Sequence, residues 1–287
     1  MFDKVHIPPI KSQGIKTKIV PHVNALIEQA QIALDGNWIE PFFGTGVVGF
    51  NAPFNGEYLA GDTNPHLIRF YQALQEDRIN DRIARCYLEE VGAELSRSSD
   101  DGTTYYKYIR DRFNRIFDPL DFLFLSRAGF NGMIRFNRKG AWNIPFCKKK
   151  DRFAPAYITK ICNQIKQIQT IIRTHEWRFE CSSFETTIGR AQAGDVIYCD
   201  PPYFGRSADF YNTWSEADER RLHELLVETD AHVILSTWHH NRFRTNPMIR
   251  ELWEGGDFHI YTLDHFYFGG GKISNRHAVT EALICNF

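Results

Sequence analysis

The chain has 287 residues, with ordinary hydrophobic (43%) and charged (24%) fractions and a net charge of −1, which by itself indicates no polyanionic partner. No apolar run reaches the ~18 to 20 residues of a membrane span, and the polar N-terminus up to Gly14 lacks the apolar segment of a signal peptide. The six cysteines include no Cys-x-x-Cys pair, which argues against a disulfide framework or a zinc site, so we expect reduced thiols, no metal and a cytoplasmic location.

The beginning of the chain alternates between loops, helices and strands. A loop over residues 7–18 precedes a helix that we expect to continue through Leu34. Apolar residues 38–40 predict a buried strand that enters a tight Pro-Phe-Phe-Gly turn, and residues 46–51 are expected to begin a helix. A second short strand is expected at 58–62.

The middle of the chain is helical, and strands return after it. Helical patterns cover residues 64–115, with a polar break at 96–103, and 156–174, whereas 127–150 is loop-like and punctuated by glycines. A helix is expected at 216–229, and strands at 177–181, 195–199, 232–236, 258–262 and 282–286. Strands at both ends of a helical middle predict one discontinuous α/β domain interrupted by an insertion.

Positive charge is concentrated in one segment. Residues 127–152 hold eight Lys or Arg and one acid, a charge of +7, which leaves −8 on the rest of the chain. A basic stripe on a nearly neutral protein is expected where a protein contacts a phosphate backbone, with a solvated cationic loop as the alternative.

A glycine pattern points to a nucleoside cofactor. Residues 44–49 fit Gly-x-Gly-x-x-Gly after a predicted strand, and Asp62 lies at the tip of the next strand. Glycines let the backbone approach a ligand closely, and a carboxylate at that tip can hydrogen-bond ribose hydroxyls. The pattern does not separate a dinucleotide from S-adenosylmethionine, and a tight turn without a ligand is the alternative.

The catalytic residues are expected in the turn after the strand at 195–199, which consists of Asp200, Pro201, Pro202 and Tyr203. The Asp200 carboxylate and the Pro201 carbonyl can accept both hydrogens of an exocyclic amine, and the Tyr203 ring can stack on a flipped base. The chain has no Pro-Cys dipeptide, which argues against cytosine C5 methylation. Asp before Pro-Pro-Tyr favours adenine N6 over cytosine N4, and in-line attack on a sulfonium methyl needs no metal or covalent intermediate.

These patterns resemble the Dam-type (D12 class) N6-adenine DNA methyltransferases over nearly the whole chain, and within that family most closely the EcoRV-type modification methylases. The segments that carry the resemblance are 9–16, 40–46, 61–64, 130–137, 140–146, 200–203, 275–276 and 281–284. The resemblance implies a Rossmann-like α/β S-adenosylmethionine-dependent methyltransferase domain, formed by residues 1–62 and 176–287. It also implies a mostly helical target-recognition domain inserted at 63–175.

The resemblance also implies the residues that bind the cofactor, S-adenosylmethionine. The lysine of the opening motif matches Lys16, and the acid that binds the ribose matches Asp62, whereas the family commonly has Trp in place of Ser12. The implied cofactor-binding residues are Ser12, Lys16, Glu40, Phe42, Gly44, Gly46, Asp62 and Asp200.

On the DNA side, the resemblance implies that Phe130 and Asn131 enter the duplex beside the flipped adenine. Arg135 matches an arginine that reads a guanine edge, with a phosphate contact as the alternative, and Lys11 matches a lysine that reads a base. The implied DNA-binding residues are Lys11, Phe130, Asn131, Met133, Arg135, Asn137, Lys148, Lys149 and Lys150.

The resulting hypothesis is site-specific adenine-N6 methylation of double-stranded DNA by a monomer, in a restriction-modification context, with GATATC or alternatively GATC as the target. The competing hypotheses are an RNA or protein-glutamine methyltransferase, a catalytically silent DNA-binding homologue and a nicotinamide-dependent enzyme. His239 and His240 are interpreted as polar surface, and Gly269, Gly270, Gly271 and Lys272 as a flexible loop.

Overall fold

The computed structural model describes residues 4–204, 211, 213–266 and 278–287. Within these residues, seven strands form one sheet in the order β3-β2-β1-β4-β5-β7-β6, in which β7 runs antiparallel to both of its neighbours. The strands are β1 (Trp38–Glu40), β2 (Tyr58–Asp62), β3 (Trp177–Cys181), β4 (Val196–Cys199), β5 (His232–Asn241), β6 (His259–Phe266) and β7 (Ala278–Cys285). The predicted mixed α/β fold is confirmed.

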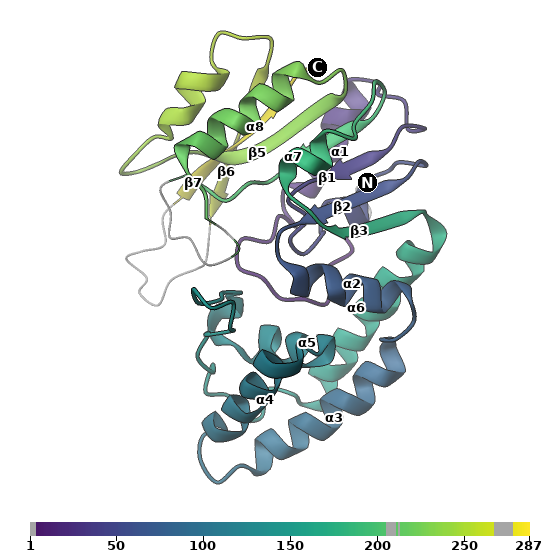
Figure 1. The fold of residues 1–287 in the computed structure, drawn as a ribbon, viewed down its shortest axis with the longest axis vertical. Coiled ribbons are helices and arrows are strands. Elements are labelled where there is room, and N and C mark those ends of the chain that lie inside the picture. Colours follow the sequence, from purple (N-terminus) through teal and green to yellow (C-terminus); the bar gives the residue numbers. More distant parts are fainter. Residues whose placement is uncertain (1–3, 205–210, 212, 267–277) are drawn as a thin grey trace.

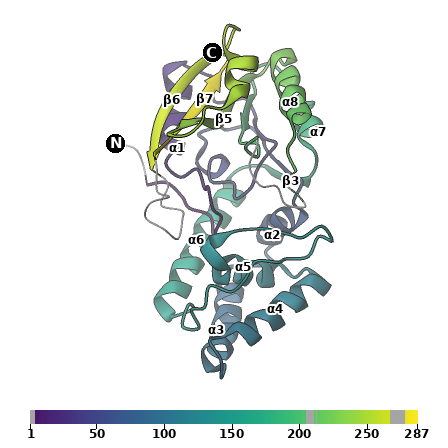
Figure 2. The same ribbon diagram turned by 90° about the vertical axis from the view of Figure 1, so that its left-hand side faces the viewer.

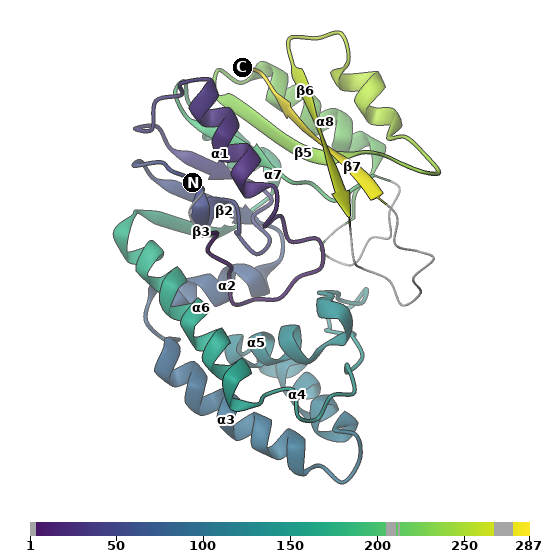
Figure 3. The same ribbon diagram turned by 180° about the vertical axis from the view of Figure 1, so that it is seen from behind.

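The central strands are buried on both faces, as parallel strands usually are. Every residue of β1, β2 and β4 is buried. In β1, Trp38 packs into a core with α1 (Val20–Gln29), whereas Ile39 packs into a core with α8 (Glu216–Glu228). Alternation of side chains along a strand therefore gives the sheet a helix on each side, α8 in front in Figure 1 and α1 in front in Figure 3.

Five helices lie between β2 and β3, below the sheet in Figure 1 and Figure 2. They are α2 (Pro65–Gln75), α3 (Asp81–Arg97), α4 (Thr103–Ile116), α5 (Pro119–Ala128) and α6 (Pro155–Thr174). The side chains of Asn64, Asn80 and Asp118 cap α2, α3 and α5 by accepting bonds from the first-turn backbone. The buried core continues from the sheet into these helices. A separate recognition domain at 63–175 therefore stays a prediction.

The loop between α5 and α6 is tied to the helices below it. Isolated bridges join Gly129 to Phe146 and Phe136 to Trp142. Trp142 is 1% exposed, and its Nε1 donates to the Tyr106 hydroxyl at 2.9 Å. The loop therefore has a fixed base, which the glycine-rich sequence did not indicate.

The predicted helix at 46–51 was wrong. Only a short 3-10 turn, η1 (Gly49–Asn51), forms there. Pro53 restricts Ala52 to an extended conformation, with ψ at 138°, so a helix cannot continue. The helix expected to reach Leu34 ends at Gln29 instead.

The last third of the chain differs from the prediction mainly in element length. The strand expected at 232–236 continues to Asn241, and the short helix α7 (Phe184–Ile188) and the five-residue helical turn η3 (Ile249–Trp253) were not predicted. The Gly269–Gly271 loop with Lys272 lies outside the described residues. No helix in the described ranges combines the length and apolarity that crossing a membrane needs.

Candidate active site

Three carboxylates meet at one edge of the sheet. Glu40 ends β1, Asp62 ends β2, and Asp200 follows β4 directly. Because these strands are parallel neighbours, their carboxyl ends lie at the same edge. Open α/β sheets bind ligands at that edge, so the fold itself brings the predicted residues together.

Asp200 lies in a hydrogen-bonded cluster built by three parts of the chain. Its Oδ1 is 3.0 Å from Lys16 Nζ and accepts a bond from Ser236 Oγ at 2.9 Å. The Asp200 side chain is 24% exposed and that of Lys16 only 8%. Burial raises the pKa of Asp200, although the Lys16 ammonium opposes that rise. Lys16 therefore favours the ionised form of Asp200.

Two hydrogen bonds hold the hydroxyl group of Tyr203 in place. It accepts a bond from Lys16 Nζ at 3.0 Å and donates one to Glu281 Oε1 at 2.9 Å. Lys16 Nζ also lies 5.0 Å from the centre of the Tyr203 ring. Lys16 thus bridges Asp200 and Tyr203, the first and last residues of the turn, while Pro201 is buried.

Sequence reasoning gave Glu281 and Ser236 no role. Glu281 is 1% exposed on β7, and Ser236 is 0% exposed on β5. One sequence signal was present, because Glu281 directly precedes the apolar run Ala-Leu-Ile in the last strand. A buried acid beside such a run needs a polar partner, which Tyr203 provides.

Asp62 ties the glycine loop to the start of α2. Its Oδ2 accepts the Gly44 backbone N–H at 2.7 Å, and its Oδ1 accepts that of Asn64 at 2.7 Å. Gly46 has a φ of 70°, and a Cβ there would lie 2.1 Å from the Phe43 ring. The loop therefore requires glycine, and Asp62 has a structural role that the sequence did not show.

The other predicted cofactor residues lie around this loop. Glu40 is 3% exposed, and its Oε2 accepts a bond from Trp38 Nε1 at 3.1 Å. Burial raises the pKa of Glu40 well above its usual value. The half-buried Phe42 ring lies 5.5 Å from that of Phe184 and 5.4 Å from that of Trp214.

Ser12 contributes little to the cluster around Lys16. It is half-buried, and its Oγ donates to the carbonyl of the neighbouring Gln13 at 3.1 Å.

Three of the predicted DNA-binding residues are exposed on the loop after α5. Phe130 is 49% exposed, and Asn131 is exposed with a left-handed φ of 54°. Arg135 is exposed, and its Nε donates to Asn143 Oδ1 at 2.9 Å. The loop thus exposes an aromatic ring, an amide and a guanidinium on the surface.

Other predicted DNA-binding residues shape this region from within. Asn137 Oδ1 accepts backbone N–H bonds from Lys139 and Ala141, which closes the turn, and Met133 is half-buried. A Cβ on Gly132 would lie 2.8 Å from Lys11 Cε, so Lys11 packs against the loop.

The lysines near the loop differ in their burial and in their charged neighbours. Burial and the nearby Arg152 lower the pKa of Lys11. Lys148, Lys149 and Lys150 are exposed, and Lys148 Nζ lies 3.6 Å from Asp101 Oδ2.

Tyr211, eight residues after Tyr203, connects this loop to the active-site edge. Its ring packs edge-on to Phe136 with a centroid distance of 5.0 Å. Its carbonyl accepts a bond from Thr63 Oγ1 at 2.9 Å, next to Asp62. Tyr211 is therefore in direct contact with both the loop and the residue next to Asp62.

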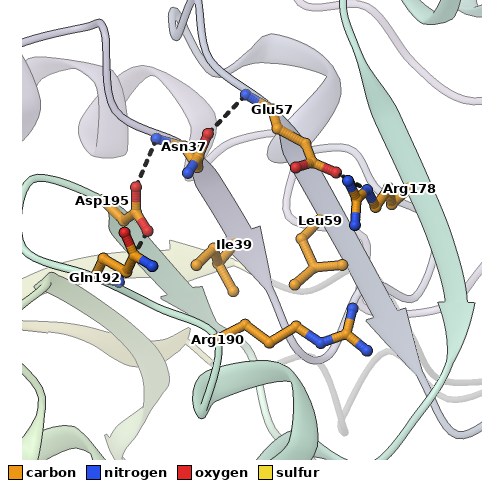
Figure 4. Close-up of a pocket in the computed structure, with 8 residues that line it drawn as sticks. All are labelled: Asn37, Ile39, Glu57, Leu59, Arg178, Arg190, Gln192 and Asp195. Carbon is orange, nitrogen blue, oxygen red and sulfur yellow. Dashed lines mark hydrogen bonds and ion pairs between the residues drawn. The ribbon is translucent and has the colours of Figure 1, made fainter.

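A pocket of about 220 Å³ lies at the opposite edge of the sheet (Figure 4). Asn37, Glu57 and Asp195 line it just before β1, β2 and β4 begin. Asn37 N donates to Asp195 Oδ1 at 2.9 Å, and Glu57 N donates to Asn37 Oδ1 at 2.9 Å. These groups bond to each other at the amino ends of the strands, so the pocket is not the candidate site. In the described part of the chain, no group of three or more His, Cys, Asp or Glu could hold a metal ion.

The sheet, with its Asp-Pro-Pro-Tyr turn after β4, is consistent with a methyltransferase fold. The family described as D12 class N6 adenine-specific DNA methyltransferase matches residues 12–267. The chain therefore belongs to this family, and it is a transferase that methylates the N6 amine of adenine in DNA. This confirms the predicted activity.

Individual relatives agree with the family. The chain is 29% identical over 284 residues to a DNA adenine methylase of Vibrio cholerae serotype O1, covering 96% of this chain and 94% of that one. It is 31% identical over 215 residues to a DNA adenine methylase of Serratia marcescens, covering 69% and 73%. It is also 25% identical over 301 residues to the type II methyltransferase M1.LlaDCHI of Lactococcus lactis subsp. cremoris, covering 99% and 97%.

Proposed function

We propose that the chain methylates one adenine within a specific sequence of duplex DNA, with S-adenosylmethionine as the donor, after the base has left the helical stack. The observation that carries the proposal is the cluster of Asp200, Lys16 and Tyr203 at the carboxyl edge of the parallel strands. It places an acceptor and an aromatic ring next to each other where this fold class binds ligands.

In this proposal, Asp200 and the Pro201 carbonyl accept the two hydrogens of the adenine N6 amine. An ionised carboxylate has about four acceptor positions, so Asp200 can keep its bonds to Lys16 and Ser236 and still accept a further N–H. Tyr203, held by Glu281, supplies the ring on which the flipped base stacks, and Pro202 keeps the turn rigid.

The amine loses a proton when it gains a methyl group. Asp200 is already in contact with the amine at that moment. Burial raises the pKa of Asp200, which makes its carboxylate a better proton acceptor.

The residues of the site fit S-adenosylmethionine, which supplies an electrophilic methyl group. Asp62 and Asp200 place two carboxylates at the edge, which favours a cationic ligand. A Cβ on Gly44 would meet only the Phe42 carbonyl, at 4.0 Å, so there is open space beside the backbone of the glycine loop. Phe42 offers a ring for an adenine, and Asp62 a carboxylate for ribose hydroxyls.

Target recognition is assigned to residues 63–175 and to the loop after α5. Exposure of Phe130, Asn131 and Arg135 supports this assignment. A guanidinium can donate two parallel bonds to guanine O6 and N7. The resemblance to EcoRV-type enzymes favours GATATC as the target, and relatives named DNA adenine methylase leave GATC as the alternative.

The cellular setting is proposed from the substrate and from the names of relatives. A relative named as a type II methyltransferase supports a restriction-modification context. A DNA substrate and six free cysteines are consistent with the cytoplasm, where the chain would act as a monomer on DNA.

The variant Asp200→Asn tests the catalytic assignment. The amide keeps the shape of the side chain but loses the charge, and loss of one transition-state hydrogen bond lowers the rate by about 10²- to 10³-fold. Single-turnover methylation measures the rate, and calorimetry with S-adenosylmethionine checks that the site still forms. Asp230→Asn, an exposed acid shortly before β5 begins, is the matched control and should keep the rate. A wild-type rate in Asp200→Asn would remove Asp200 from the mechanism.

A further inference from the structure

The turn at the end of β5 is a second cationic surface, separate from the basic segment at 127–152. We propose that Arg242, Phe243 and Arg244 bind the phosphate backbone of the duplex beside the catalytic edge. The inference rests on the proposed function, because it assumes that duplex DNA enters at the edge that carries Asp200.

Composition and exposure set this turn apart. No acid occurs between residues 231 and 250, a stretch that contains three arginines. Arg242 and Arg244 are exposed, and neither is in an ion pair with a described carboxylate. Phe243 is 72% exposed, the largest exposed fraction among the large apolar side chains that the structure describes. Exposed cations on both sides of an aromatic ring are typical of nucleic-acid-binding surfaces.

The turn is held rigidly by its own backbone. Asn241 Oδ1 accepts the backbone N–H of Phe243 at 2.8 Å and that of Arg244 at 3.1 Å. Asn241 N donates to the Arg244 carbonyl at 2.9 Å, and a bridge joins His240 to Thr245. The turn therefore needs little ordering when it binds a partner.

One of the two cations is also positioned in advance. The Arg244 guanidinium carbon lies 5.2 Å from the ring centre of Trp238, which is only 2% exposed. A guanidinium stacked on a fixed ring keeps its N–H groups available for phosphate oxygens.

The fold places this turn on the side of the active site. β4 and β5 are parallel neighbours, and Ser236 on β5 contacts Asp200. β5 continues from Ser236 to Asn241 and so carries the turn about 17 Å beyond Ser236, at ~3.3 Å per residue. The end of β5 and the loop after α5 lie on the same side of the molecule, at the left in Figure 1 and at the right in Figure 3. A duplex on that side can contact both surfaces at once.

Salt dependence of DNA binding tests the proposal. In the double variant R242Q/R244Q, the log–log slope of affinity against salt should become shallower by up to about 1.8, because each lost phosphate contact contributes ~0.9. The substitutions leave the Asn241 backbone bonds intact and remove only the stacking of Arg244 on Trp238, so the thermal midpoint should fall by no more than about 2–4 °C. The probe is a synthetic duplex without GATATC or GATC, since phosphate contacts do not depend on sequence.

The matched control removes the same charge elsewhere. Arg82 on α3 and Lys166 on α6 are exposed, and Figure 1 places these helices away from the end of β5. R82Q/K166Q should leave the slope close to that of the wild type. If both double variants shift the slope equally, the effect is one of net charge and the proposal fails.

An unchanged slope in R242Q/R244Q would also overturn the proposal. The wild-type chain, assayed for adenine methylation in parallel, separates this result from a failure of the proposed function. A methylating wild type with an unchanged slope in the variant refutes only the second surface. A wild type that methylates adenine at no specific sequence, with a shallower slope in the variant, refutes only the proposed function.

Discussion

Replacing Lys16 by Met should move the acid limb of the pH–activity profile to higher pH. Asp200 acts as an ionised acceptor in the proposed mechanism, so activity falls as the pH drops through the pKa of Asp200. Burial raises that pKa, and the Lys16 ammonium, 3.0 Å away, lowers it. Without that ammonium, the pKa of Asp200 rises further.

The size of the change follows from the geometry. A neighbouring opposite charge typically lowers a carboxyl pKa by about 1 to 3 units. Both side chains are mostly buried, at 24% and 8% exposed, but water still reaches Asp200. We therefore expect the acid limb to move up by about one to two pH units, or about 1.4 kcal/mol per unit.

The assay is the pH dependence of kcat/KM for DNA at saturating S-adenosylmethionine, which reports groups of the enzyme before DNA binds. Lys11→Met is the matched control, since Lys11 lies in the same segment but packs against Gly132. It should lower kcat/KM evenly at every pH. Superimposable acid limbs in the wild type and Lys16→Met would refute the electrostatic role of Lys16.

Three further variants test the remaining assignments. Asp62→Asn should weaken S-adenosylmethionine binding and also lower the free energy of unfolding by about 1–3 kcal/mol, because the amide cannot accept both backbone bonds from Gly44 and Asn64. Calorimetry and thermal melts that match the wild type would contradict this. Arg135→Ala should lose about 1–3 kcal/mol of discrimination at one base pair of the target, whereas even losses at all positions in an oligonucleotide competition would indicate a backbone contact. Alanine at all three lysines of 148–150 should weaken binding to every duplex alike and flatten the salt slope by up to ~0.9 per contact, and a changed sequence preference would contradict that role.

The sequence predicted those strands and helices whose patterns depend only on neighbouring residues in the chain. The strands at 58–62 and 177–181 were predicted with the bounds that the structure has, because the first is a short, mostly apolar run and the second alternates apolar and charged residues. The helix at 46–51 failed because the effect of Pro53 on Ala52 outweighed the glycine pattern. Both outcomes depend on residues close together in the chain.

The contacts within the site could not be predicted in the same way. Lys16 is 187 residues from Tyr203, and Tyr203 is 78 from Glu281, so only the folded sheet brings them together. The sequence placed Asp62 at a strand tip but gave no sign of its bonds to Gly44 and Asn64. Periodicity reports which face of an element is buried, not which distant side chain lies opposite.

Methylation-aware sequencing of DNA from cells that express the chain gives the base, the position and the target sequence together. We expect N6-methyladenine in a single sequence context, GATATC or GATC, and its loss when Asp200→Asn replaces the wild type. Methylcytosine, or methyladenine scattered without a common sequence, would show that the chain is not a site-specific adenine methyltransferase.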